Sequence, residues 1–390
     1  MRVDRVSLAA AAAGISTFLN LYTPQAVLPS LAATFGVPLA RTGLTITASL
    51  LAVALVAPFA GAISDAFGRK RLIVGAALAV TVPTVLVATS PTLEAMLLWR
   101  FVQGLLLPFV FAVTVAYIGE ECEGPAAIRA AGVYSSGAIF GGFSGRFVAG
   151  IAAEFGGWRL GFLAAAALTG LAAIAVAILL PQEKKFRPMR GGVRATLRGW
   201  REHMGNGRLW GTCAVGFGML FSVVATFTYV NFRLAGAPFN LSPGALGSVF
   251  SVYLVGVITT PLSTRLAVAI GRQRTAALAA AVAIAGELWT LLPTLPAVIL
   301  GLALASAGLF VAQALGLGFI GVAAPRARSS AVGIYVSTYY VGGALGGLLP
   351  GGLWHRFGWP GCVALACAMI FAMGIAAVAT FRDPAAPAHG

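Results

Sequence analysis

The chain has 390 residues, of which 59% are hydrophobic and only 9% are charged, and its formal net charge is +15. Because a soluble domain carries about 25% charged residues, this composition excludes a protein whose whole surface faces water. The mean hydropathy of +0.92, the 49 glycines and the 20 prolines are typical of a helical membrane protein.

Apolar stretches of about 20 residues predict membrane-spanning helices along the whole chain. We expect twelve spans, at 7–29, 42–63, 72–90, 94–118, 130–153, 159–181, 208–232, 244–266, 275–293, 297–322, 329–353 and 359–381. The predicted fold class is therefore an all-α membrane protein. No cleavage pattern stands apart from the first apolar run, so we expect that run to remain as the first span.

The basic residues predict the orientation of the chain. An even number of spans places both termini on one side of the membrane. If that side is the cytoplasm, 20 of the 26 Lys and Arg lie there and only four lie at the opposite side. This distribution follows the positive-inside rule, so the charge is explained by orientation and no nucleic-acid partner is expected.

An internal repeat divides the chain into two parts. Six residues recur at an offset of 201, namely Gly132, Tyr134, Gly142, Gly145, Gly150 and Trp158, matched by Gly333, Tyr335, Gly343, Gly346, Gly351 and Trp359. The repeat predicts two six-span bundles in the same orientation, over 1–181 and 208–390, joined by the basic segment 182–207. Transporters built from such parallel repeats bind substrate between the halves, near the middle of the membrane.

The first span carries polar groups near Pro24. The proline is expected to kink the helix and free a backbone carbonyl. Asn20, Tyr22 and Gln25 are therefore candidates for contact with a substrate. Hydrogen bonding within the bundle is the alternative interpretation.

The segment between spans two and three contains Gly61, Asp65 and Gly68, followed by Arg69-Lys70-Arg71. This spacing resembles the signature loop of the major facilitator superfamily, and the span count, repeat and linker extend the resemblance over nearly the whole chain. We expect Gly61 to allow close helix packing and Gly68 to allow a tight turn.

The resemblance implies that Gly61, Asp65, Gly68, Arg69 and Lys70 form a conformational latch. Asp65 would dock at the start of span eleven, where Ser329 or Ser330 is the expected N-cap, and would hold the outward-facing state. A solvated turn that only sets the topology is the alternative. Val268 stands where Asp65 would recur, so only one latch carboxylate is expected.

Span four contains Arg100, followed by Gln103 and Gly104, which resembles a second signature of the family. The resemblance implies a role for Arg100 in proton coupling and places Gln103 at the substrate cavity. Charged residues inside a membrane are by default functional candidates. The alternative for Arg100 is a side chain that extends to the outer membrane surface.

Span five contains Gly137, Gly141, Gly142, Gly145 and Arg146. It resembles a degenerate form of the antiporter motif of the family, and its Gly-Arg resembles a branch of bacterial export permeases related to arabinose-efflux proteins. The usual proline is missing, and helix packing alone would also explain the glycines. Arg146 is a candidate for the substrate cavity.

In the second half, Glu287 is the one carboxylate within an apolar run. It is a candidate proton carrier, and a position in the outer headgroup region is the alternative. Gln313 and Tyr339 are further candidates for the substrate cavity. Two intramembrane arginines against one glutamate favour a neutral or anionic substrate.

These features predict a proton-coupled exporter of a small organic molecule, acting as a monomer in a bacterial inner membrane with both termini in the cytoplasm. An anion-uptake symporter or a facilitator of the same fold is the alternative, and a membrane-embedded enzyme or sensor is a distant one. The four cysteines are scattered, and no nucleophile or metal-ligand constellation is visible. We therefore expect no catalytic residue, no metal site and no cofactor, and the expected partners are the substrate, protons and lipid.

Overall fold

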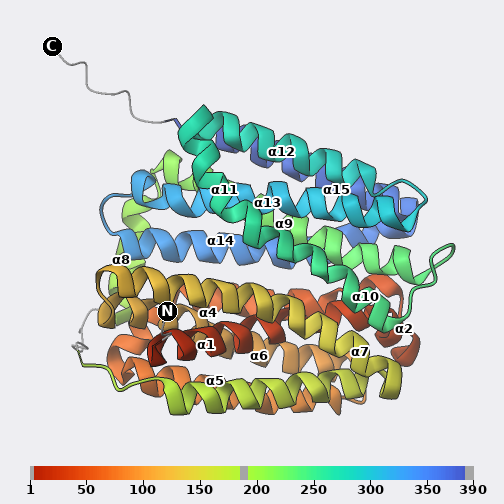
Figure 1. The fold of residues 1–390 in the computed structure, drawn as a ribbon, viewed down its shortest axis with the longest axis horizontal. Helices are drawn as coiled ribbons and strands as arrows, with labels where there is room; N and C mark the ends of the chain where they lie inside the picture. The colour runs from red at the N-terminus through yellow and green to blue at the C-terminus, as the bar shows by residue number, and fades with distance from the viewer. Residues whose placement is uncertain (1–3, 185–191, 383–390) are drawn as a thin grey trace.

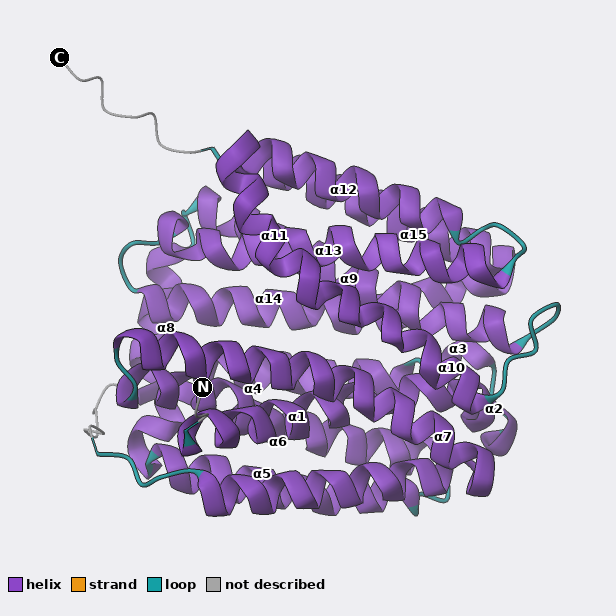
Figure 2. Cartoon of the chain, in the orientation of Figure 1, coloured by secondary structure: helices purple, strands orange, loops and turns teal. Residues whose placement is uncertain are grey.

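The computed structural model describes residues 4–184 and 192–382, and the regular elements in these ranges are helices (Figures 1 and 2). The first half contains α1 (Arg5–Tyr22), the 3₁₀ helix η1 (Thr23–Val27), α2 (Leu28–Phe35), α3 (Leu39–Thr42), α4 (Leu44–Phe67), α5 (Arg69–Ala88), α6 (Leu93–Glu121) and α7 (Gly124–Leu179). After α8 (Gly192–His203), the second half contains α9 (Gly207–Ala235), α10 (Pro243–Val249), the 3₁₀ helix η2 (Phe250–Leu254), α11 (Val255–Ile270), α12 (Arg272–Trp289), α13 (Leu295–Ala323), α14 (Arg328–Leu348) and α15 (Pro350–Thr380).

These helices form twelve membrane spans. Within the described residues, nine helical segments are long and apolar enough to cross a membrane. One of them, α7, has 56 residues and is broken at Gly156 and Gly157, so it supplies two spans. The remaining two spans are α12 and α14, in which arginines and hydroxyl side chains lower the hydropathy. The predicted all-α membrane fold is confirmed.

Two features of the span boundaries were not predicted. Helical structure continues from span five into span six and breaks at Gly156 and Gly157, and the φ of 71° at Gly157 suits glycine. Gly358, at φ 62°, makes the corresponding break within α15. Span eleven, expected over 329–353, is divided, because α14 ends at Leu348 and Pro350 starts the next helix.

Each half packs as a group of helices, the first half in red to yellow and the second in green to blue (Figure 1). In the first half α1 packs along α7, and in the second half α9 packs along α14. A Cβ at Gly145 would lie 2.3 Å from the carbonyl oxygen of Leu19, and a Cβ at Gly346 would lie 2.3 Å from that of Phe221. These matching close approaches show the repeat in the packing, and they confirm a packing role for span-five glycines.

The two halves meet differently at the two ends of the molecule. We call the end with α8 the basic end and the end with α3 and α10 the opposite end (left and right in Figure 1). At the opposite end α7 packs on α10, η1 on α9, and the start of α4 on the end of α14. Toward the basic end α4 and α14 stay paired, but α7 shares far fewer contacts with α11 than it shares with α10 at the opposite end.

Candidate functional site between the two halves

Arg100 lies on α6, is fully buried, and binds the backbone of the first span. Pro24 has no N–H to donate to the carbonyl of Asn20, so α1 ends at Tyr22 and the chain continues as η1. The Arg100 guanidinium donates to the carbonyl oxygens of Asn20 and Leu21 at 2.8 and 2.6 Å. The predicted kink is confirmed, and the Arg100 side chain does not extend to the membrane surface.

The other donors of Arg100 reach further helices. Its Nε donates to the carbonyl of Thr45 on α4 at 3.0 Å, and Nη1 donates to Gln103 at 2.6 Å. Gln103 in turn donates to Thr84 on α5 at 2.8 Å, and Thr84 donates to the Asn20 side chain at 2.8 Å. Asn20 thus makes hydrogen bonds within the bundle, which was the alternative to substrate contact for this residue, and Gln103 belongs to the same network.

Arg146, on α7, is 1% exposed and has fewer hydrogen-bond partners than Arg100. Its Nε donates to Gln25 at 2.7 Å and its Nη1 donates to the carbonyl of Gly142 at 2.5 Å. A guanidinium has five N–H donors, so three find no hydrogen-bond acceptor among the described residues. Nor does any carboxylate of the described chain form a salt bridge with Arg146.

Aromatic rings from both halves surround the Arg146 guanidinium. Its Cζ atom lies 4.4 Å from the ring centroid of Tyr22 on α1 and 4.6 Å from those of Phe250 and Tyr253 on η2. Ring faces attract a cation and offset part of the cost of its burial. Gln25, which accepts from Arg146, also donates to Thr228 of α9 at 3.1 Å. Arg146 therefore lies where the halves meet.

Tyr339 and Gln313 lie beside this group of rings. Gln313 donates to the Tyr339 hydroxyl at 3.0 Å. Tyr339 packs edge-on against Tyr340 with the centroids 5.2 Å apart, and Tyr340 contacts Phe111 of the first half at 5.9 Å. The structure thus brings Tyr22, Gln25, Arg146, Gln313 and Tyr339 to the interface between the halves, separate from the Asn20–Gln103 network.

The helix faces that carry the Arg146 site become exposed toward the basic end. On α7, the positions at helical spacing from Arg146 are Gly142 and Ile139, half-buried, and then Ser135 and Gly132, exposed. On α1, the positions that continue from Tyr22 are Phe18, Ile15 and Ala11, half-buried, and then Leu8, exposed. The α1 and α7 faces that lead away from the Arg146 site are therefore exposed toward the basic end.

Glu287, on α12, is fully buried inside the second half. Thr226 of α9 donates to its Oε1 at 2.5 Å, and its Oε2 has no hydrogen-bond partner. Its side chain therefore faces the inside of the bundle and not the surroundings of the protein. At the repeat offset of 203 that relates Gly68 to Gly271, the counterpart of Glu287 is Thr84, so both halves hold a buried polar group there.

The loop between α4 and α5 is organised around Arg69. Arg69 forms salt bridges of 2.6 Å with Asp65 and with Glu120, and it donates to the Ser64 hydroxyl and the Gly61 carbonyl. Gly68 has a φ of 91°, which confirms the predicted tight turn. The expectation for Gly61 is wrong, because a Cβ there would meet no atom within 4 Å. Gly61 contributes its carbonyl to Arg69.

The start of α14 also differs from the expectation. Its N-cap is Ala327, in the left-handed conformation at φ 44°, and neither Ser329 nor Ser330 caps the helix. Ser330 instead lies against Gly199 of α8, and His203 of α8 lies 3.2 Å from the Ala327 carbonyl. In this structure α8 lies beside the helix start at which Asp65 was expected to dock.

Glu154 is a residue of the interface that the sequence did not single out. It lies on α7 at the opposite end, and its Oε1 accepts from the backbone N–H of Gly244 at 2.9 Å and from the Ser242 hydroxyl. Both partners belong to the second half, at the start of α10. No motif surrounds Glu154, so only the packing of the two halves identifies it.

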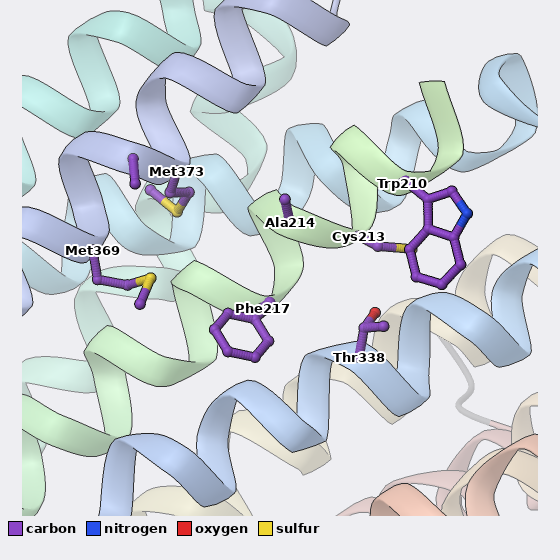
Figure 3. A pocket seen from close by; sticks show the side chains of 8 residues that line it. Trp210, Cys213, Ala214, Phe217, Thr338, Met369 and Met373 are labelled. Atoms are coloured by element: carbon purple, nitrogen blue, oxygen red, sulfur yellow. The ribbon is translucent and has the colours of Figure 1, made fainter. Parts of the chain in front are cut away.

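A pocket of approximately 330 Å³ lies within the second half, between α9, α14 and α15 (Figure 3). Its lining is Trp210, Cys213, Ala214, Phe217, Thr338, Met369, Ala372 and Met373. These side chains are almost entirely apolar. The lining includes none of the predicted site residues, so the pocket is separate from the Arg146 site.

Comparison with known proteins agrees with this architecture. The family model described as Major Facilitator Superfamily matches residues 10–237 and 233–390. The Inner membrane transport protein YnfM of Escherichia coli is 32% identical over 366 residues, which cover 94% of this chain and 88% of that protein. The Multi-drug resistance efflux pump PmrA of Streptococcus pneumoniae is 31% identical over 147 residues, which cover 38% of this chain and 36% of that protein.

Among solved structures, the nucleoside transporter NupG has a TM-score of 0.78 at 16% identity, covering 97% of this chain and 100% of that one. This likeness shows a shared fold. The relatives found are transporters, not enzymes. Because the family model spans nearly the whole sequence and YnfM aligns over 94% of it, this chain belongs to the major facilitator superfamily, a family of secondary transporters.

Proposed function

We propose that this secondary transporter exports a small organic molecule from a bacterium in exchange for protons. The observation that carries the proposal is the unequal contact of the halves: α7 packs closely on α10 at the opposite end but makes few contacts with α11, which continues from there toward the basic end. Alternating access requires a site between two bodies that part at one end at a time. We take these bodies to be 1–181 and 208–390, joined by 182–207, and because one chain holds both, a monomer suffices.

The orientation we propose places the basic end, with both termini, in the cytoplasm. It rests on the excess of basic residues at that end. The name of the relative YnfM supports a position in the inner membrane. With this orientation the structure corresponds to the inward-facing state, in which substrate reaches the Arg146 site from the cytoplasm.

For the coupling step we propose Glu287 as the proton carrier. It is buried, has one oxygen without a hydrogen-bond partner, and forms no salt bridge among the described residues. A buried carboxyl group with one oxygen free of hydrogen-bond partners has room to hold a proton on that oxygen, so it is suited to gain and lose a proton during the cycle. Arg100 contributes by holding the kinked first span in position.

The direction of transport rests on resemblance. The motif around Gly141 and Arg146 resembles that of export permeases, and the partial likeness to the efflux pump PmrA supports export. Proton-coupled uptake of an anion is the second candidate, which the unpaired charge of Arg146 favours. Vesicles of known orientation separate the two, since they show in which direction substrate moves along with an imposed pH gradient.

The test uses purified protein in proteoliposomes that enclose a pH-sensitive dye. A panel of small organic acids, amides and amines is added under an imposed pH gradient, and proton movement is recorded. We expect at least one compound to dissipate the imposed pH gradient. Glu287→Gln should abolish this proton movement while exchange of labelled compound between the two sides continues, because glutamine preserves the shape but cannot carry the proton.

Glu94→Gln is the matched control, since Glu94 is an exposed carboxylate paired with Arg41 at 3.0 Å. It should behave as the unmodified protein does. Proton movement that persists at full rate in Glu287→Gln would exclude Glu287 as the carrier, and the absence of proton movement with every compound would exclude proton coupling.

A further inference from the structure

We propose that Arg146 is the binding group for an organic monoanion, a carboxylate or sulfonate carried on an aromatic body. This inference rests on the proposed transport function and names its substrate class. It follows from the hydrogen-bond capacity that Arg146 leaves unused, the rings around it, and the side from which it is approached.

The contrast between the two buried arginines decides which one is free to bind a ligand. Arg100 makes four hydrogen bonds to carbonyl and amide oxygens, so its guanidinium is occupied by the protein itself. Arg146 makes two, and no carboxylate of the described residues pairs with it. A buried charge with unused donors is costly unless another group completes its coordination.

A carboxylate or sulfonate group has the geometry to complete the coordination of the Arg146 guanidinium. Its oxygens accept two parallel hydrogen bonds from the terminal nitrogens of a guanidinium, which is the strongest common pairing of this side chain. The Nη2 atom of Arg146 has no hydrogen-bond partner in the described chain, and the Nε and one Nη1 donor are already used. The free donors therefore lie on the two adjacent terminal nitrogens, which suits a single anionic group.

The surroundings select the rest of the ligand. Tyr22, Phe250 and Tyr253 surround the guanidinium. Aromatic side chains recognise apolar and ring-shaped groups by stacking and edge contacts. A strongly hydrated inorganic anion would lose its water here and gain only the free donors of Arg146 in return. A ligand with an organic body is therefore favoured.

The rings that contact Arg146 come from both halves, which links binding to the transport cycle. Tyr22 belongs to the first half, whereas Phe250 and Tyr253 belong to the second. An anion bound to Arg146 would therefore touch both bodies at once. Since the α1 and α7 faces leading to it are exposed only toward the basic end, the ligand enters there in this conformation.

The experiment measures binding to the full-length protein in lipid nanodiscs. The probes are benzoate and 2-naphthoate, their carboxamides, and benzylamine, and binding is read from quenching of tryptophan fluorescence and from the thermal unfolding midpoint. We expect each carboxylate to bind at least about tenfold more tightly than its amide, equivalent to about 1.4 kcal/mol. Benzylamine should not bind, because its charge repels Arg146.

Two variants test whether Arg146 causes the preference for acids over amides. Arg146→Gln should bind acid and amide equally, and Arg146→Lys, which keeps the buried charge, should retain only part of the preference because it lacks the planar fork. Arg159→Gln is the matched control, since Arg159 also lies over an aromatic ring, Trp158 at 4.2 Å, but is exposed. It should bind as the unmodified protein does. Where Arg146→Gln does not fold, the Lys variant carries the test.

Equal binding of acids and amides to the unmodified protein would overturn the inference. So would a ratio of acid to amide affinity that is unchanged in both Arg146 variants. If inorganic phosphate competes with benzoate for binding, the site recognises a free anion and not an organic one. That result also overturns the inference. The transport proposal is judged separately: if acids bind but proteoliposomes show no proton-coupled movement of them, the binding site stands and the coupled exporter does not.

Discussion

Two arginines inside a membrane protein can serve opposite purposes, and here their partners distinguish them. Arg100 supplies donors to backbone oxygens at the point where Pro24 ends the helical pattern of the first span. Arg146 contacts rings and two acceptors only. The first arginine therefore stabilises a fixed kink within one half, and the second marks a place where something else can bind.

We predict that Arg100→Met destabilises the protein more than Arg146→Met. Removing Arg100 leaves buried carbonyl oxygens without its donors, and each buried acceptor left unsatisfied costs about 1–3 kcal/mol. Arg146→Met removes a charge that has few partners, so the loss should be much smaller. The measurement is the thermal unfolding midpoint in detergent, compared across the two variants. Equal midpoints for Arg100→Met and the unmodified protein would show that the kink does not need this side chain.

For single residues, the sequence identifies which side chains are important more reliably than it identifies what those side chains contact. Arg100 and Arg146 stand out as charges in apolar runs, and Pro24 predicts its kink from covalent structure alone. The partners of Arg100 lie 79 and 80 positions away in the chain, so they depend on how helices pack and cannot be predicted from spacing. The ring group around Arg146 depends likewise on contact between the halves.

Among the elements, α7 and α10 form the contact that covers the site at the opposite end. A Cβ at Gly150 would lie 2.4 Å from the Pro243 carbonyl oxygen, so the two helices touch backbone to backbone. Glu154 completes the contact by accepting from the N–H of Gly244 and the hydroxyl of Ser242. A carboxylate at a helix start is favoured by the orphan N–H groups and the helix dipole.

We therefore predict that Glu154→Ala weakens closure at the opposite end. Loss of a charge-assisted hydrogen bond of about 1.5–3 kcal/mol should shift the population toward the state open at that end. Spin labels at the exposed positions Phe155 and Ala237, in a cysteine-free background, report the distance between the halves. The distribution should move to longer distances in the variant.

Glu94→Ala is the comparison for that measurement, because it removes a carboxylate whose partner Arg41 lies in the same half. It should leave the distance distribution unchanged. If Glu154→Ala and Glu94→Ala give the same distribution, the contact of Glu154 with α10 does not contribute to closure.

Element positions were predicted where local chemistry fixes them. Span centres follow from hydropathy, and the turn at Gly68 follows from the glycine between two helices. The role of Gly61 and the start of α14 were predicted wrongly, because each is decided by a neighbour that hydropathy does not reveal. Arg69 takes the Gly61 carbonyl, and α8, which lies outside any predicted span, covers Ser330.

For the whole molecule, α8 and the loop before α5 compete for the same place at the basic end. Helix α8 packs on both α4 and α14, with the Trp200 ring stacked on Phe59 at 6.2 Å between centroids. Asp65, the proposed latch, is paired with Arg69 at 2.6 Å. Closing the basic end with Asp65 at the start of α14 requires α8 to leave Ser330. The position of α8 therefore favours the state seen here, which is open at the basic end. The latch favours the state that is closed at the basic end.

We predict that Trp200→Ala and Asp65→Asn shift the conformational equilibrium in opposite directions. Loss of the Trp200 contacts should favour closure of the basic end, because they hold α8 in the place seen in this conformation. Loss of the Asp65 charge should favour the open basic end and slow transport, while the protein stays folded and binds substrate. Spin labels at the exposed positions Ile128 on α7 and Val268 on α11 report this end. Shorter distances for Trp200→Ala and longer ones for Asp65→Asn are expected, and shifts of the same sign would mean that α8 and the latch do not oppose each other.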